Sequence, residues 1–184
     1  MQRKQYISLL FLFPLLWLVG CVGPAPRGPG PYAPNHVYSV TLGKTWTAYP
    51  QNRKVRTQSL TIDGLQLNQL ILGYGLRNNA SLIRTPRSFS GLFVPRFRSS
   101  MTDVEIVEFI IDSLKAAAMA EINVTDIKPD YFGTLKGVSF SFEGTIETGL
   151  PYSGMAKAAK EGDRLHFIIY HAPSEYYYEL HKQE

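Results

Sequence analysis

The residue types that could carry chemistry in this chain are one cysteine, four histidines and a few serines. The histidines are His36, His166, His171 and His181. His166 and His171 stand five residues apart in one predicted strand, and this odd separation points them to opposite faces. Neither a His-Glu-x-x-His nor a Gly-x-Ser-x-Gly motif accompanies them. These spacings predict a protein that is not an enzyme and that has no metal site and no cofactor.

A predicted loop at residues 75–100 is the main candidate for binding, because it carries five arginines and no acidic residue. They are Arg77, Arg84, Arg87, Arg96 and Arg98. A guanidinium forms paired hydrogen bonds with phosphate or carboxylate oxygens, so the loop predicts an anionic envelope component or an acidic protein patch as partner. The alternative is that these arginines pair with acidic residues of the same domain.

Charge is divided along the chain in a way that supports this alternative. Residues 1–102 hold 12 Lys or Arg and one acidic residue, whereas residues 103–184 hold 7 Lys or Arg and 14 acidic residues. The two parts therefore carry +11 and −7, which sum to the net charge of +4. Because basic and aromatic residues do not combine in any nucleic-acid-binding motif, we expect no nucleic acid as partner.

A second candidate surface is the tyrosine-rich segment near the C-terminus, where Tyr176, Tyr177 and Tyr178 are consecutive. On a helix, three consecutive side chains point in three directions, so at least one ring should face solvent or a partner. The alternative is that these tyrosines cap the core and direct their hydroxyls into water.

The elements that would position these residues begin with an N-terminal leader. Residues 1–4 are basic, and residues 7–19 are almost wholly apolar. This order is typical of a secretory signal, and the apolar run is shorter than the ~20 residues that span a bilayer. The leader ends at Leu18-Val19-Gly20-Cys21, which holds the chain's one cysteine.

Residues 18–21 resemble the lipobox of bacterial lipoproteins. The resemblance implies a signal peptide at residues 1–20, cleavage before Cys21, and acylation of Cys21 as a membrane anchor. Residue 22 is Val rather than Asp, which by analogy with Gram-negative lipoproteins implies the outer membrane. We expect the periplasmic face, although this analogy does not choose between the two sides of that membrane. The alternatives are an ordinary secretory signal with a coincidental cysteine and a signal anchor that is not cleaved.

Behind the leader, residues 21–36 contain five prolines and several glycines, a composition typical of a semi-extended tether. Residues 37–184 are long enough for one domain with its own core. Strands are predicted at residues 37–42, 59–63, 65–74, 122–127, 138–142, 152–159 and 165–171. Short turns between consecutive strands favour an antiparallel sheet.

A long amphipathic helix is predicted from Thr102 to near Ala120. Thr102 and Glu105 fit a capping box, and apolar residues recur at helical spacing behind them. A short C-terminal helix is predicted after Ser174, which is a suitable N-cap residue. Strands, helix, strands and short helix together predict an α+β domain with both helices packed on the sheet.

This order of elements is similar to the PsbP-like α/β/α sandwich. Residues 60–68, 97–102 and 149–152 also resemble a group of uncharacterised proteobacterial lipoproteins. Neither resemblance carries an activity or a functional residue to this chain. The sequence therefore predicts a non-catalytic interaction or accessory module of the envelope. The alternative is a small-ligand or lipid binder that uses a cleft between the sheet and the arginine-rich loop at residues 75–100.

Overall fold

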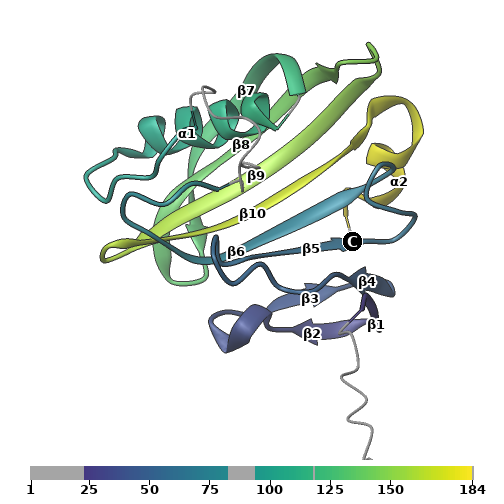
Figure 1. Ribbon diagram of the computed structural model, residues 1–184, viewed down its shortest axis with the longest axis horizontal. Coiled ribbons are helices and arrows are strands. Elements are labelled where there is room, and N and C mark those ends of the chain that lie inside the picture. The colour runs from purple at the N-terminus through teal and green to yellow at the C-terminus, as the bar shows by residue number, and fades with distance from the viewer. Residues whose placement is uncertain (1–22, 83–93, 118, 184) are drawn as a thin grey trace, which may run out of the picture.

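The computed structural model describes residues 23–82, 94–117 and 119–183 (Figure 1). The predicted signal peptide at 1–20, Cys21, Arg84 and Arg87 lie outside the described residues. In the described part of the chain, no helix is both long enough and apolar enough to cross a membrane.

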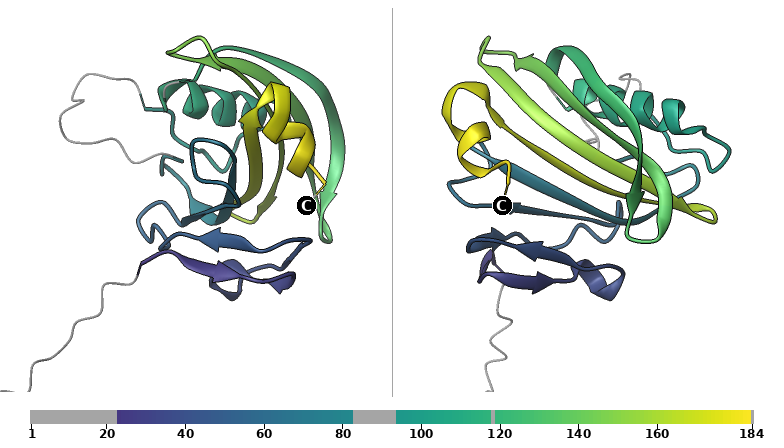
Figure 2. Two further views of the ribbon diagram at one scale, coloured as in Figure 1. Left: turned by 90° about the vertical axis from the view of Figure 1, so that its right-hand side faces the viewer. Right: turned by 180° about the vertical axis from the view of Figure 1, so that it is seen from behind.

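An antiparallel sheet of eight strands organises the described domain, in the order β1-β4-β5-β6-β10-β9-β8-β7. Its strands are β1 (Ala25–Arg27), β4 (Trp46–Ala48), β5 (Thr57–Thr61), β6 (Gln69–Arg77), β7 (Met119–Phe132), β8 (Leu135–Ile146), β9 (Pro151–Glu161) and β10 (Arg164–Pro173). A separate two-stranded sheet joins β2 (Gly30–Tyr32) to β3 (Val40–Leu42). Sheet and helices together make an α+β domain, and the long β7–β8 edge bends in an arc (Figure 2).

The two faces of the sheet carry separate apolar cores. Along β10, Leu165, Phe167 and Ile169 belong to the larger core, which the helix α1 (Asp103–Ala116) covers. Ile168 and Tyr170 point the other way and pack with the smaller core under β3 and β4. A continuous apolar run such as residues 167–170 is typical of a strand that is covered on both sides.

The predicted capping box of α1 is confirmed. The backbone N–H of Glu105 donates to the Thr102 hydroxyl at 3.3 Å, and the Thr102 N–H donates to the Glu105 carboxylate at 2.7 Å. These two bonds satisfy donors that a helix start otherwise leaves unpaired. The helix ends at Ala116 rather than near Ala120, because Met119 already begins β7 and pairs with Ile146.

Two glycines allow aromatic rings to lie flat against neighbouring strands. A Cβ on Gly73 would lie 2.2 Å from the ring of Phe167, and a Cβ on Gly154 would lie 2.2 Å from the ring of Phe142. Both rings are fully buried in the larger core. Each glycine is therefore required by side-chain packing rather than by its backbone conformation.

The predicted tether at residues 21–36 is wrong for most of its length. Residues 25–27 form β1 and pair with β4, with Ala25 opposite Ala48. Residues 30–32 form β2, and Pro34–His36 form a short 3₁₀ turn whose proline is buried. The tether was predicted from proline and glycine content alone. This content does not exclude strands, because proline is tolerated in short edge strands. The folded domain begins at Ala25 instead of residue 37.

The outer strand β7 is long and irregular. Its register with β8 shifts after Ala120 and again after Thr125. Glu121 and Asp126 adopt positive φ angles of 48° and 55° at these two places. Bulges of this kind bend an edge strand and increase its twist.

The C-terminal helix differs from its prediction in detail. A π-helical turn, η3 (Ser174–Tyr178), leads into α2 (Glu179–His181). Pro173 rather than Ser174 occupies the N-cap position, so the prediction for Ser174 is wrong. The Ser174 hydroxyl instead lies 2.8 Å from the hydroxyl of Ser153 on β9, which ties the segment to the sheet.

Candidate functional site

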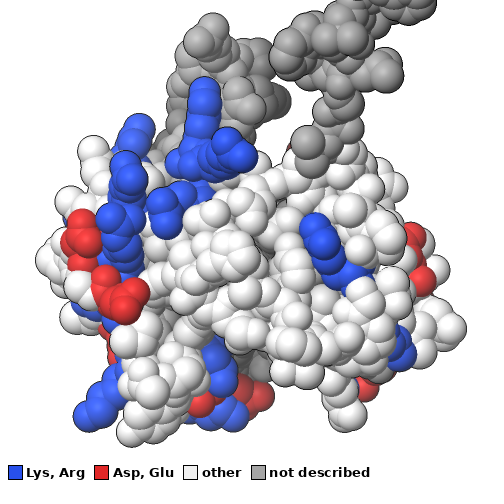
Figure 3. Space-filling view, turned by 90° about the horizontal axis from the view of Figure 1, so that it is seen from below, with Lys and Arg blue, Asp and Glu red and all other residues white. Residues whose placement is uncertain are grey.

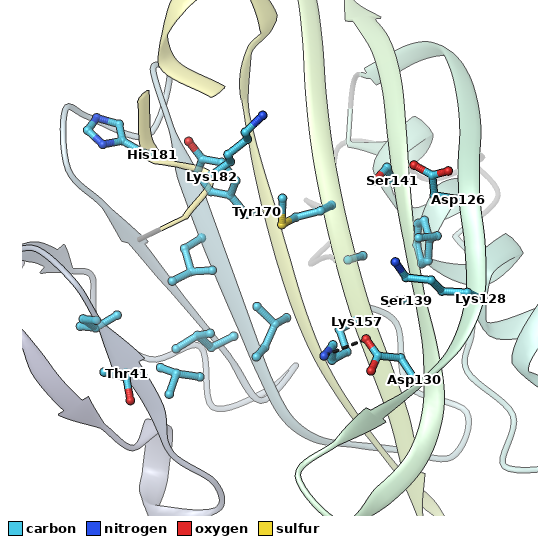
Figure 4. A pocket seen from close by; sticks show the side chains of 18 of the residues that line it. Thr41, Asp126, Lys128, Asp130, Ser139, Ser141, Lys157, Tyr170, His181 and Lys182 are labelled. Atoms are coloured by element: carbon cyan, nitrogen blue, oxygen red, sulfur yellow. Dashed lines mark ion pairs between the residues drawn. The ribbon is translucent and has the colours of Figure 1, made fainter. Parts of the chain in front are cut away.

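A cavity of about 500 Å³ lies on the sheet face opposite α1, under the strands β3 and β4 (Figure 4). It is bounded below by β6, β10 and β9, on one side by β3 and β4, and on the other by β7 and β8. The C-terminal residues His181 and Lys182 lie at one end. A volume of this size is within the range of small-molecule sites.

One side of this cavity is apolar. Its lining residues there are Val40, Leu42, Trp46, Leu70, Leu72, Met155 and Ile168. Leu72 and Trp46 are almost fully buried, whereas Leu70, Met155 and Ile168 keep part of their surface accessible. The indole of Trp46 meets the ring of Tyr170 edge-on at 6.4 Å, which fixes both aromatic groups. This side can accept a hydrocarbon chain or ring.

The opposite side is polar and charged. It is formed by Asp126, Lys128, Asp130, Ser139, Ser141 and Lys157. The ammonium of Lys157 lies 2.8 Å from the carboxylate of Asp130. That hydrogen bond, with a second from the Tyr131 backbone, lowers the pKa of Asp130 to about 2. Asp130 is therefore ionised at neutral pH, and Figure 4 shows it together with Lys157 beside the cavity.

A contact between the buried His181 and the carboxylate of Asp63 lies at the end of the cavity where the C-terminal residues are. His181 Nε2 lies 2.8 Å from Asp63 Oδ2, and Asn68 donates to the same carboxylate at 2.6 Å. His181 is buried, at only 6% exposed, although it lies three residues from the end of the sequence. Its Nδ1 has no hydrogen-bond partner among the described residues. We interpret the His181–Asp63 contact as the attachment of the C-terminus to the turn after β5.

His166 and His171 lie on opposite faces of β10, as their spacing predicts. His166 is buried beside the rings of Tyr38 and Phe132, on the face of the cavity. Burial lowers the pKa of His166 despite the Glu161 carboxylate 3.1 Å away. His171 lies on the α1 face, where burial lowers its pKa to about 4. Both imidazoles are therefore neutral at pH 7.

The arginines of the predicted binding loop are divided between two places. Arg96 donates to the carbonyl of Asn79 at 2.9 Å, and Arg98 lies 3.8 Å from the Glu105 carboxylate. Both line a cleft of about 670 Å³ against α1, beside Glu108 and Asp112. The described loop thus faces acidic residues of α1, and its cleft lies against the helix rather than the sheet. Arg77 lies elsewhere, at the end of β6.

The three C-terminal tyrosines also divide. Tyr176 is 62% exposed, which agrees with the prediction that at least one ring faces outwards. The ring of Tyr178 stacks on Tyr170 at 5.8 Å, and the Tyr170 hydroxyl donates to the Tyr177 carbonyl at 3.0 Å. The segment therefore combines core capping with one exposed aromatic ring.

Sequence reasoning did not identify the cavity residues, although one signal was present. Residues 70–72 and 167–170 are continuous apolar runs on strands, which predict burial on both faces. The sequence predicts one helix after Thr102 and one short C-terminal helix. The sheet face without the first helix therefore has few residues to cover it. The pairing of Lys157 with Asp130 has no local signal, because the two residues meet across β7, β8 and β9.

No family model, curated protein or solved structure matches this chain. Its function must therefore be argued from the site itself.

Proposed function

We propose that the domain binds an amphipathic small molecule in the cavity under β3 and β4. The observation that supports this is the division of the cavity into an apolar side around Leu72 and a charged side around Lys157. A molecule with a hydrocarbon part and a polar head satisfies both sides at once, whereas a wholly polar or wholly apolar molecule satisfies only one.

We further propose that the protein is a lipoprotein of the cell envelope, anchored by acylated Cys21 to the periplasmic face of the outer membrane. Ala25, the first residue of β1, follows Cys21 by four positions. Four extended residues reach roughly 14 Å at most. The anchor would hold the sheet close to the bilayer, where membrane-derived amphiphiles are concentrated. The role is one of binding and presentation, without catalysis.

An interaction module is the second candidate, and it rests on the exposed C-terminal segment. Tyr176 and Leu180 are 62% and 44% exposed, and an exposed tyrosine is a common anchor of protein interfaces. We also propose that the domain is a PsbP-like sandwich. The strand–helix–meander order supports it, although the C-terminal helical layer is short.

Photo-crosslinking in intact cells tests the amphiphile proposal without extracting the full-length protein. A photoreactive phenylalanine analogue replaces Met155, which lines the cavity, or Ile127, which is 51% exposed on β7. We expect a small-molecule adduct at position 155, detected as a discrete mass increase, and its loss in an Ile168→Glu background. Equal labelling at both positions, or no small-molecule adduct at position 155, would rule the proposal out.

The interaction module makes a different prediction in the same cells. The photoreactive analogue at position 176 should give a protein-sized adduct if the C-terminal segment contacts a partner. A protein adduct at position 176 without a small-molecule adduct at position 155 would favour the second candidate.

A further inference from the structure

A second, smaller cavity at the end of β6 collects positive charge. It measures about 130 Å³ and is lined by Arg53, Lys54, Arg56, Leu76, Arg77 and Ala80. Four of these six residues are cationic and none is acidic. The volume of this cavity is enough for one small oxyanion.

The guanidinium of Arg56 is held in place from several directions. Its Nε donates to the Tyr74 carbonyl at 3.1 Å, and the Tyr74 N–H donates to the Arg56 carbonyl at 3.0 Å. The guanidinium carbon also lies 5.6 Å from the centre of the Tyr74 ring. Arg56 adopts a positive φ of 54°, an unfavourable conformation that clusters at functional sites in proteins.

The turn that carries Arg53 and Lys54 is fixed by Asn52. The backbones of Asn52 and Thr57 exchange two hydrogen bonds, at 2.8 and 3.2 Å. The Asn52 side chain accepts a third from the Lys54 N–H at 3.2 Å. The cations therefore project from a closed turn beside the ordered Arg56.

Like charges oppose each other across the adjacent strand pair. Arg77 on β6 stands directly opposite Arg164 on β10. Opposed like charges destabilise a pair of strands. Arg164 lies 3.9 Å from the exposed Asp163 carboxylate. Within the described residues, Arg53, Lys54 and Arg77 form no ion pair with an acidic residue, so only Arg164 of the opposed pair has a carboxylate beside it.

We propose that Arg53, Lys54, Arg56 and Arg77 form a binding site for a phosphate-class oxyanion. Two or more guanidinium groups around a small cavity match the tetrahedral oxygens of phosphate. The view from below shows most of the visible Lys and Arg towards one side of the molecule, with acidic groups among them, and a broad uncharged surface beside them (Figure 3). This site is separate from the amphiphile cavity and does not depend on that proposal. Only Arg77 belongs to the arginine set that the sequence singled out.

The test uses the full-length protein in a non-ionic detergent, titrated calorimetrically with inorganic phosphate and with glycerophosphoglycerol, a soluble diester headgroup analogue. We expect saturable binding that weakens as salt concentration rises. The double variant Arg56→Gln/Arg77→Gln should lose at least tenfold in affinity. Lys115→Gln/Lys136→Gln removes the same charge from exposed positions outside the cluster and should retain binding.

Two further results make the test decisive. Arg53→Gln/Lys54→Gln changes only exposed turn side chains, so weaker binding in this variant cannot be attributed to misfolding of the Arg56 contacts. Tighter binding of inorganic phosphate identifies a free phosphate group as the ligand, and tighter binding of the diester identifies a lipid headgroup. No binding of either probe, or equal losses in cluster and control variants, overturns the proposal.

Discussion

The two faces of the sheet are built from the same strands but are finished differently. The face under α1 buries large residues such as Phe167 and Ile169 completely. On the other face, β3, the outer sheet strand β4 and the C-terminal segment border a cavity around which Ile168 and Met155 stay partly accessible. The 14-residue helix α1 packs over the larger core on its face, whereas β3 and β4 have three residues each and border a cavity on the other. If the proposed function is correct, one face of the sheet mainly stabilises the domain and the opposite face binds the ligand.

The largest expected effect comes from truncating adjacent residues on opposite faces. Phe167→Ala should lower the free energy of unfolding by about 3–5 kcal/mol, because it removes a fully buried ring. Ile168→Ala should cost about 1–2 kcal/mol, because its side chain is only partly buried. Denaturant titration of the full-length chain measures both. Equal losses would contradict the division between the faces.

A smaller effect is expected from adding one methyl group beneath the Phe167 ring. Gly73→Ala places a Cβ 2.2 Å from that ring and should cost about 1–3 kcal/mol through overpacking. The added volume should be tolerated better in Gly73→Ala/Phe167→Leu, because leucine can withdraw from the strand. Thermal unfolding of the single and double variants measures this rescue. If the stability loss of the double variant equals the sum of the two single losses, the contact between residue 73 and the ring of Phe167 is not the cause of the loss in Gly73→Ala.

Acid should affect the α1 face through His171. Burial lowers the folded-state pKa of His171 to about 4, against about 6.5 in the unfolded chain. The unfolded state therefore binds more protons between these values, so stability falls as pH drops from 6.5 towards 4. His171→Gln should flatten this dependence in unfolding curves recorded across that range. An unchanged slope would assign the acid sensitivity to other groups, such as His166.

The smallest effect on stability is expected at the charged side of the cavity. Lys157→Met removes a partly exposed ion pair with Asp130 and should change the unfolding free energy by less than about 1 kcal/mol. Crosslinking of the proposed amphiphile at position 155 should nevertheless fall, because its polar head loses a cation. A large loss of stability with unchanged crosslinking would reverse the roles that we assign to the two faces.

Much of the fold was accessible from the sequence because its signals are local. Thr102 and Glu105 predicted the start of α1, and the alternation of Val138, Phe140 and Phe142 with polar residues predicted β8. The strand at residues 65–74 was placed too early, since residues 64–68 form a turn and β6 begins at Gln69. Residues 25–32 were misassigned because their strand character depends on pairing with β4 and β3 rather than on composition.

The candidate sites were harder to predict, because their residues meet only through the sheet. Leu72 and Trp46 come together across β6, β5 and β4, and Arg56 meets Arg77 through the contact of Arg56 with Tyr74. The loop at residues 75–100 was predicted to bind an anionic partner because it carries several arginines and no acidic residue. In the fold, however, Arg98 faces Glu105, an acidic residue of α1. Charge density along a chain does not report which cations lack a partner in space.

The irregular backbone of the edge strand β7 should limit strand pairing between neighbouring copies of the protein. A straight strand of 14 residues at the margin of a sheet would offer a row of free amides and carbonyls to any neighbouring copy. The bends at Glu121 and Asp126, with Pro129 further along, interrupt that row. If Cys21 anchors the protein as we propose, copies in the plane of the membrane would meet often, and the interrupted edge of β7 should disfavour strand pairing between them.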